Sequence, residues 1–202
     1  MRVGVLASGA GTNLQAILDH VHGREGVEVA AVSSDKADAP ALARATAAGV
    51  PTDVFALADH ADRAARDRAM ADFLTGHDVE LVVLAGYMAL LTPDFLARFP
   101  MRVVNVHPAL LPAFPGVRAI EQALEYGVKV FGVTVHFVDD GVDTGPVIAQ
   151  RAVELPDAEG PDEVREALRP LEHELLCDAV RQIARGAITV DPQRPRRVTV
   201  GR

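Results

Sequence analysis

The sequence predicts an α/β protein with a single open, mostly parallel, Rossmann-like twisted sheet and helices on both faces. Short valine-rich runs alternate with longer stretches of helical periodicity, which is typical of βαβ units. The run 79–85 is apolar throughout and suits a strand covered on both sides. Hydrophobic residues make up 49% of the 202 residues, enough for one sizeable core. We therefore expect one domain over residues 1–202.

The first half of the chain supplies most of the parallel sheet. Apolar, β-branched runs predict strands at 3–7, 27–32, 52–55, 79–85 and 102–106. Between them, the spacing of apolar residues predicts helices at 14–21, 41–48 and 62–74. Helical connections between successive strands favour parallel pairing.

The second half continues with two more strands and a long helix. Strands are expected at 130–138 and 147–155, followed by a helix over 161–185. Pro170 should kink or interrupt that helix, because proline lacks the N–H that the helix needs. The last residues, 187–202, contain prolines and arginines and are expected to form a C-terminal surface extension.

Charge and composition narrow the class of partner. The formal net charge of −8 argues against nucleic acid or an anionic membrane, since both require clustered basic residues. No apolar run approaches the roughly 20 residues that span a bilayer, and the N-terminus lacks a secretory pattern. The single cysteine, Cys177, lies among apolar neighbours and is interpreted as a structural residue. These features predict a cytoplasmic protein that acts on small molecules.

A glycine-rich turn, residues 8–13, follows the first predicted strand. Its glycines let backbone N–H groups approach an anion, and the helix that follows adds unpaired donors and the positive end of its dipole. Thr12 or Asn13 is expected to cap this helix. The turn therefore predicts a site for a phosphate ester.

The same turn has a second interpretation, a dinucleotide-binding fingerprint. Asp35 lies near the position of a ribose-binding acid, but Leu14 stands where the fingerprint requires a third glycine. A purely structural turn is a third interpretation. The phosphate-ester site ranks first.

Asn105 and His107 alternate on an otherwise apolar predicted strand, so both side chains leave the same face near its C-terminal end. Ligands of open α/β sheets bind beyond that end of the strands. The apolar loop 109–116, stiffened by prolines, follows directly and can cover a ligand. A polar pair beneath an apolar loop indicates chemistry rather than simple loop support.

Asp143 belongs to an acidic, glycine-containing loop between two predicted strands, residues 139–146. A calcium site is not favoured, because an EF-hand loop lies between helices and ends on a distant glutamate. A carboxylate next to an imidazole fixes its tautomer and favours its protonated form. We therefore expect Asp143 to pair with His107.

Together the segments SGAGTN, LAGYM, NVHPALLP and HFVDDGVDTGPVIAQ resemble the folate-dependent formyltransferases, most closely those that act on glycinamide ribonucleotide (GAR). The resemblance covers nearly the whole chain. It implies transfer of a formyl group from the cosubstrate 10-formyltetrahydrofolate to the glycine amine of GAR, without a metal. Asn105, His107 and Asp143 match the catalytic trio of that family.

The resemblance also implies binding residues. It places the GAR phosphate on Gly11, Thr12 and Asn13, and the glycinamide end near Glu172. Residues matching positions around the folate are Arg63, Met88, Ala89, Leu90, Leu91, Asp139, Asp140, Gly141 and Val142. Asp35 stands where many relatives show asparagine and is interpreted as surface variation. A monomer or a homodimer is expected.

Two other functions compete with this one. Formyltetrahydrofolate hydrolases share the same core but usually carry an additional N-terminal domain. A non-catalytic dinucleotide-binding module would need the missing third glycine and would leave the trio unexplained. Methionyl-tRNA formyltransferases add an RNA-binding domain for which 202 residues leave no room.

Overall fold

The structure, a computed structural model, describes residues 1–201. The chain divides into two compact units, Met1–Asn105 and Val106–Arg202, and strand β5 (Val103–His107) crosses from one to the other. Seven strands follow the order β3-β2-β1-β4-β5-β6-β7 in one sheet, and β8 and β9 form a separate pair. The predicted α/β class with an open, mostly parallel sheet is confirmed.

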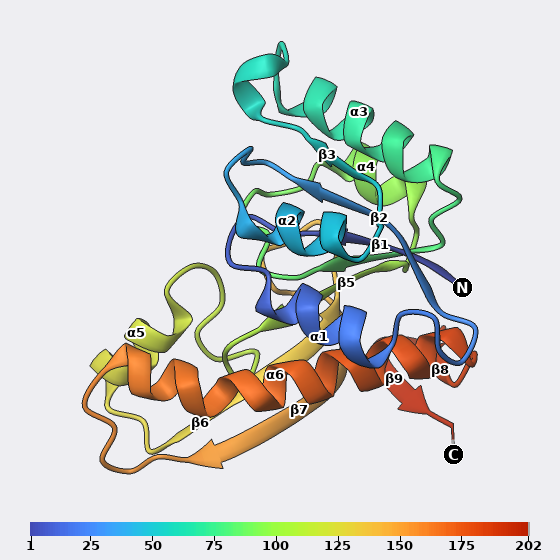
Figure 1. The fold of residues 1–202 in the computed structure, drawn as a ribbon. Helices are drawn as coiled ribbons and strands as arrows, with labels where there is room; N and C mark the ends of the chain where they lie inside the picture. The colour runs from blue at the N-terminus through green and yellow to red at the C-terminus, as the bar shows by residue number, and fades with distance from the viewer. Residues whose placement is uncertain (202) are drawn as a thin grey trace. The chain divides into compact units, whose positions relative to one another are not determined.

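The first unit alternates strands and helices along the chain (Figure 1). Its strands are β1 (Arg2–Leu6), β2 (Glu28–Ser34), β3 (Thr52–Val54) and β4 (Leu81–Leu84). Its helices are α1 (Thr12–His20), α2 (Pro40–Ala47), α3 (Arg63–Gly76) and α4 (Pro93–Arg98), with a short 3-10 helix, η1 (Leu57–Asp59), before α3. All pairings within this unit, through β5, are parallel.

Burial explains why the first unit has this architecture. The central strands β1 and β4 are apolar on both faces, and Val3, Val5 and Val82 have no exposed surface. Strands of this kind must be covered twice. Right-handed crossovers place α1 and α2 on one face and α3 and α4 on the other, and the helices of each pair contact one another.

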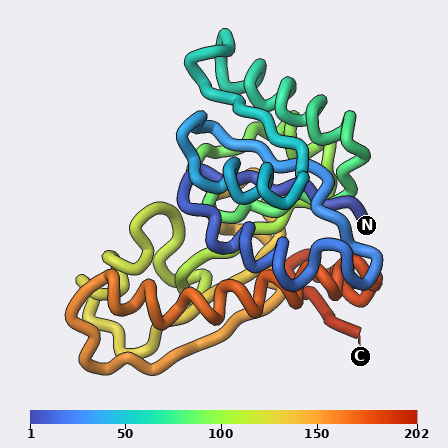
Figure 2. The backbone as a smooth tube through the Cα atoms, in the orientation of Figure 1, coloured from blue at the N-terminus to red at the C-terminus, as the bar shows by residue number. Residues whose placement is uncertain are grey.

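The second unit is built on an antiparallel pair. Strands β6 (Val130–Phe137) and β7 (Val147–Glu154) pair from Val130 to His136, with a register shift between Val135 and His136, and helix α6 (Pro161–Ala184) packs on both. Helix α5 (Ala119–Tyr126) precedes β6 and contacts α6. Figure 2 shows the wide loop, residues 108–118, that leads from β5 into α5. In the described part of the chain, no helix has the length and apolar character needed to cross a membrane.

Several local expectations need correction. Of the two effects expected of Pro170, a kink or an interruption, interruption does not occur: the residue lies inside α6, which is continuous from Pro161 to Ala184. Neither Thr12 nor Asn13 caps α1: Gly11 is the N-cap residue, in a left-handed conformation, and Thr12 is the first helical residue. The expected C-terminal surface extension contains a hairpin of β8 (Ile188–Asp191) and β9 (Arg194–Val200), which was not predicted.

Candidate active site

The glycine turn lies at the start of α1, as predicted. Gly11 has φ 71° and ψ 31°, and a Cβ atom at this position would lie 2.7 Å from the Cβ of Ala41. A left-handed residue in contact with α2 must be glycine. The amides at the start of α1 have no acceptor within the helix, which is the arrangement that binds anions.

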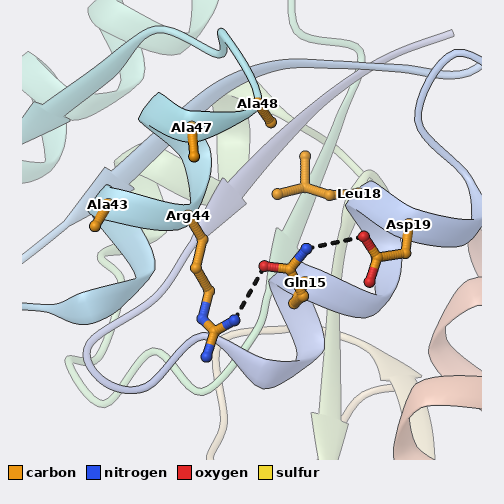
Figure 3. A pocket seen from close by; sticks show the side chains of 7 residues that line it. All are labelled: Gln15, Leu18, Asp19, Ala43, Arg44, Ala47 and Ala48. Carbon is orange, nitrogen blue, oxygen red and sulfur yellow. Dashed lines mark hydrogen bonds between the residues drawn. The ribbon is translucent and has the colours of Figure 1, made fainter.

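Arg44 of α2 supports the turn from the side (Figure 3). Its Nε donates to the carbonyl of Ala10 at 2.8 Å, and its Nη1 donates to Oε1 of Gln15 at 3.0 Å. Gln15 in turn donates to Asp19. The turn that precedes α1 is therefore tied to the neighbouring helix by side-chain hydrogen bonds, which limits its movement. Sequence reasoning did not identify this support.

The segment 88–91 follows β4 in the first unit. Met88 and Leu90 expose most of their side chains, while the segment as a whole has no regular secondary structure. Arg63, the other folate candidate of this unit, is exposed on the first turn of α3. Asp35, interpreted from the sequence as surface variation, is half-buried, and its carboxylate accepts a hydrogen bond from Ser8 Oγ.

Asn105 and His107 occupy the last part of β5, at alternate positions, as the sequence predicts. Asn105 is half-buried and His107 is buried. His107 Nε2 lies 2.8 Å from the carbonyl oxygen of Phe114 in the loop 108–118. The imidazole is thus held at the end of the strand rather than directed freely into solvent.

Asp143 connects two histidines. Its Oδ2 lies 3.3 Å from His107 Nδ1, and its Oδ1 lies 3.5 Å from Nε2 of the buried His136. The second nitrogen of His136, Nδ1, lies 2.8 Å from the carbonyl oxygen of Phe137. The predicted proximity of Asp143 and His107 is present, and His136 joins them as a third member.

The carboxylate of Asp143 is held in its charged form. Burial, the largest single influence, raises its pKa, but hydrogen bonds from His136 and the Gly116 amide, together with the charges of His107 and His136, bring the pKa below its ordinary value. The Gly116 amide donates to Oδ2 at 2.7 Å. Asp143 has φ 54°, a conformation that aspartate and asparagine tolerate better than most residues.

The loop 108–118 is anchored to β6 and β7. Thr134 Oγ1 accepts from the Leu111 amide at 3.1 Å and donates to the Ala109 carbonyl at 2.7 Å. Gln150 adds a bond to the Leu111 carbonyl at 2.9 Å. Gly132 leaves room for the loop, because a Cβ there would lie 2.4 Å from a side-chain carbon of Leu110. Hydrogen bonds to β6 and β7 therefore fix the position of the first part of the loop.

The acidic loop carries the remaining candidates of the second unit. Asp139 accepts from the Gly141 amide and from Thr144 Oγ1, while Asp140 and Val142 are exposed. Arg196 of β9 donates to the Thr144 carbonyl at 2.8 Å, so the C-terminal hairpin contacts this loop. Glu172 is half-buried on α6. Among residues 1–201, no cluster of three or more His, Cys, Asp or Glu side chains has an arrangement suited to a metal ion.

His136 and Arg196 are the residues near Asp143 that sequence reasoning missed. His136 shares a strand face with Thr134, a pattern that equally fits buried structural polar groups. A signal for His136 was nevertheless present, because it begins the same HFVDDGVDTG segment that ends with Asp143 and its neighbours.

Comparison with known proteins gives a consistent result over the whole chain. The formyl transferase family matches residues 1–180. The chain is 43% identical over 203 aligned residues to the phosphoribosylglycinamide formyltransferase of Mycobacterium tuberculosis, covering 99% of this chain and 94% of that protein. The crystal structure of glycinamide ribonucleotide transformylase 1 from Symbiobacterium toebii is 47% identical, with a TM-score of 0.95, covering 100% of this chain and 94% of that one.

A more distant likeness is also informative. The crystal structure of a formyltetrahydrofolate deformylase from Pseudomonas syringae has a TM-score of 0.90 at 25% identity. The match includes all of this chain but only 66% of the deformylase chain. The two relatives above match this chain over nearly their full length and at higher identity.

Proposed function

The chain belongs to the formyl transferase family, and we propose that it transfers the formyl group of 10-formyltetrahydrofolate to the amine of phosphoribosylglycinamide in purine biosynthesis. The supporting observation is the near-complete match in length and sequence to phosphoribosylglycinamide formyltransferases. A cytoplasmic location, catalysis without a metal, and a monomeric or homodimeric state are further parts of the proposal.

In the proposed reaction, the glycine amine attacks the formyl carbon. A C–N bond forms to the amine and the bond from that carbon to N10 of the folate breaks, while one proton leaves the amine and one is gained by N10. Negative charge develops on the formyl oxygen in the tetrahedral intermediate. Asn105 and His107 are proposed to donate hydrogen bonds to this oxygen, which is where preorganised donors lower the barrier most.

Asp143 is proposed to orient His107 and to help move the proton. The 3.3 Å contact between His107 Nδ1 and the Asp143 carboxylate supports this role. It directs the Nδ1 edge of the imidazole toward the carboxylate, so that Nε2 is the nitrogen proposed to interact with the substrate. Nε2 now faces the Phe114 carbonyl at 2.8 Å. Donation to the formyl oxygen therefore requires His107 to exchange this loop carbonyl for the substrate.

Substrate binding is proposed to use residues outside the catalytic trio. Gly11, Thr12 and Asn13 would hold the phosphate with the amide groups at the start of α1. Glu172 would contact the glycinamide end. Folate contacts are proposed for the segments 88–91 and 139–142 and for the exposed Arg63.

The deciding experiment follows release of tetrahydrofolate from 10-formyltetrahydrofolate with and without GAR. Release that requires GAR, with one formylated GAR formed for each tetrahydrofolate, is the expected result. Release at the same rate without GAR would contradict the transferase and favour the hydrolase, in which water accepts the formyl group. Absence of tetrahydrofolate release under both conditions would contradict both the transferase and the hydrolase activity.

A further inference from the structure

The segment after β4 presents two large apolar side chains to solvent. Met88 is 61% exposed and Leu90 is 57% exposed, although they come only four and six residues after the end of β4, a strand whose residues are all buried. Apolar side chains of this size, adjacent in space to a buried strand end, are typical of a ligand-binding surface. Such a surface binds best when its shape exists before the ligand arrives.

Polar side chains hold the backbone of this segment in three places. Ser8 Oγ accepts from the Met88 amide at 2.9 Å, and Arg66 Nη2 donates to the Leu90 carbonyl at 3.1 Å. Asp67 Oδ2 accepts from the Thr92 amide at 2.7 Å. These hydrogen bonds with side chains take the place of the backbone–backbone hydrogen bonds that would hold a strand or helix.

Arg66 and Asp67 form a buried ion pair on α3. Their side chains are 3% and 1% exposed, and Asp67 Oδ1 lies 2.6 Å from Nη2 and 2.8 Å from Nε of Arg66. Removing two charged groups from water is unfavourable, and an apolar pair would fill the same space without that desolvation penalty. An apolar pair, however, could neither donate a hydrogen bond to the Leu90 carbonyl nor accept one from the Thr92 amide.

We propose that Arg66 and Asp67 are positioning residues that hold the segment 88–91 in the shape that binds the formyl donor. This inference rests on the proposed function, because it takes that segment as part of the folate site. Arg66 and Asp67 themselves are buried beneath the segment and act through its backbone. Without them the segment must be ordered during binding, which weakens donor binding and leaves the transfer step unchanged.

The test is Asp67→Asn, assayed with each substrate varied in turn. The KM for 10-formyltetrahydrofolate should rise about tenfold or more, as for loss of a charged hydrogen bond. The KM for GAR and kcat should each stay within about twofold. The matched control is Asp72→Asn, which removes the charge of another aspartate of α3, one that forms an exposed pair with Arg98 of α4 at 3.0 Å, and should change none of these constants.

A second variant covers the case in which Asp67→Asn does not fold. The double substitution Arg66→Met with Asp67→Leu replaces the pair by apolar side chains of similar size, which buried pairs often tolerate. It should fold, show faster hydrogen exchange at the amides of 88–92, and raise the KM for the formyl donor. A folded variant of either kind with an unchanged donor KM would overturn the inference. Failure of the proposed function is separate, since it appears as absence of GAR-dependent turnover in the wild-type protein.

Discussion

At the scale of single residues, the first prediction concerns His107. Replacing it with alanine removes the proposed donor to the formyl oxygen, so kcat should fall by about 10²- to 10⁴-fold. GAR affinity should change little, because the glycine turn proposed to bind its phosphate is made by other residues. Steady-state kinetics and calorimetric titration with GAR measure the two effects. Loss of GAR binding in a variant that still folds would show that His107 is a structural residue.

Asp143 gives a prediction on stability and pH. Its pKa is lower in the folded protein than in the unfolded chain, so the folded state binds the proton less tightly. The resulting stabilisation is complete above the unfolded value of about 4 and is lost as pH falls through the folded value. Asp143→Asn, which removes this charge, should therefore be less stable than the wild type near pH 7, with a gap that narrows below about pH 4.

The measurement is urea unfolding of both proteins between pH 3 and 7. Asparagine is the suitable replacement because it tolerates φ 54° as aspartate does. Asp78→Asn is the matched control: Asp78 also has a positive φ, 56°, but is exposed. A gap between wild type and Asp143→Asn that stayed constant over this range would contradict the charge-based account.

Residue-level prediction succeeded where a side chain belongs to a local motif. His107 and Asp143 were paired correctly because each ends or follows a strand at the same edge of the sheet. Arg66 and Asp67 were not singled out, because charged residues adjacent in a helix ordinarily point to solvent. Their burial results from the packing of α3 and the position of Leu90, which lies 24 residues further along the chain.

At the scale of elements, the glycine turn supports a prediction that substitution of Gly11 and substitution of Gly9 have different effects. Gly11→Ala places a Cβ 2.7 Å from Ala41 in a left-handed residue, and should cost about 1–2 kcal/mol in backbone conformation alone. The same change moves the start of α1, so the KM for GAR should also rise. Gly9→Ala is the control, because a Cβ there meets no atom within 4 Å. Thermal unfolding and GAR kinetics compare the two, and equal stability of both variants would contradict the structural account.

The elements themselves were predictable to different degrees. The strands of the sheet were located to within two residues, because continuous apolar runs are characteristic of strands covered on both faces. Helices α4 and α5 were not predicted, and α4, with 6 residues, has too few turns to show periodicity. The hairpin of β8 and β9 was missed because its strand β9 is mostly exposed and contains a proline and several arginines.

At the scale of the whole molecule, fold class followed from periodicity, whereas the reaction required recognition of a family. Alternating strands and helices describe many proteins that share no chemistry. The polar cluster alone predicts a histidine and a carboxylate at a sheet edge. A formyl donor and an amine acceptor are added by the likeness to phosphoribosylglycinamide formyltransferases over the full chain.

Global stability can be followed through Cys177, the single cysteine of the chain. It is 3% exposed on α6, and burial raises the pKa of its thiol to about 11, with Arg181 lowering and Asp178 raising it. Both access and thiolate formation are therefore suppressed in the native state. Labelling by a thiol reagent at pH 8 should be slow without denaturant and should accelerate in step with unfolding seen by circular dichroism.

The control for this measurement moves the thiol to the surface of the same helix. Cys177→Ala combined with Glu174→Cys places it at an exposed position, where labelling should be fast in the native protein and insensitive to denaturant below the unfolding transition. If native Cys177 labels as fast as this control, α6 opens locally and independently of the rest of the protein. Labelling that tracks unfolding instead means that α6 stays packed on β6 and β7 until its whole unit unfolds.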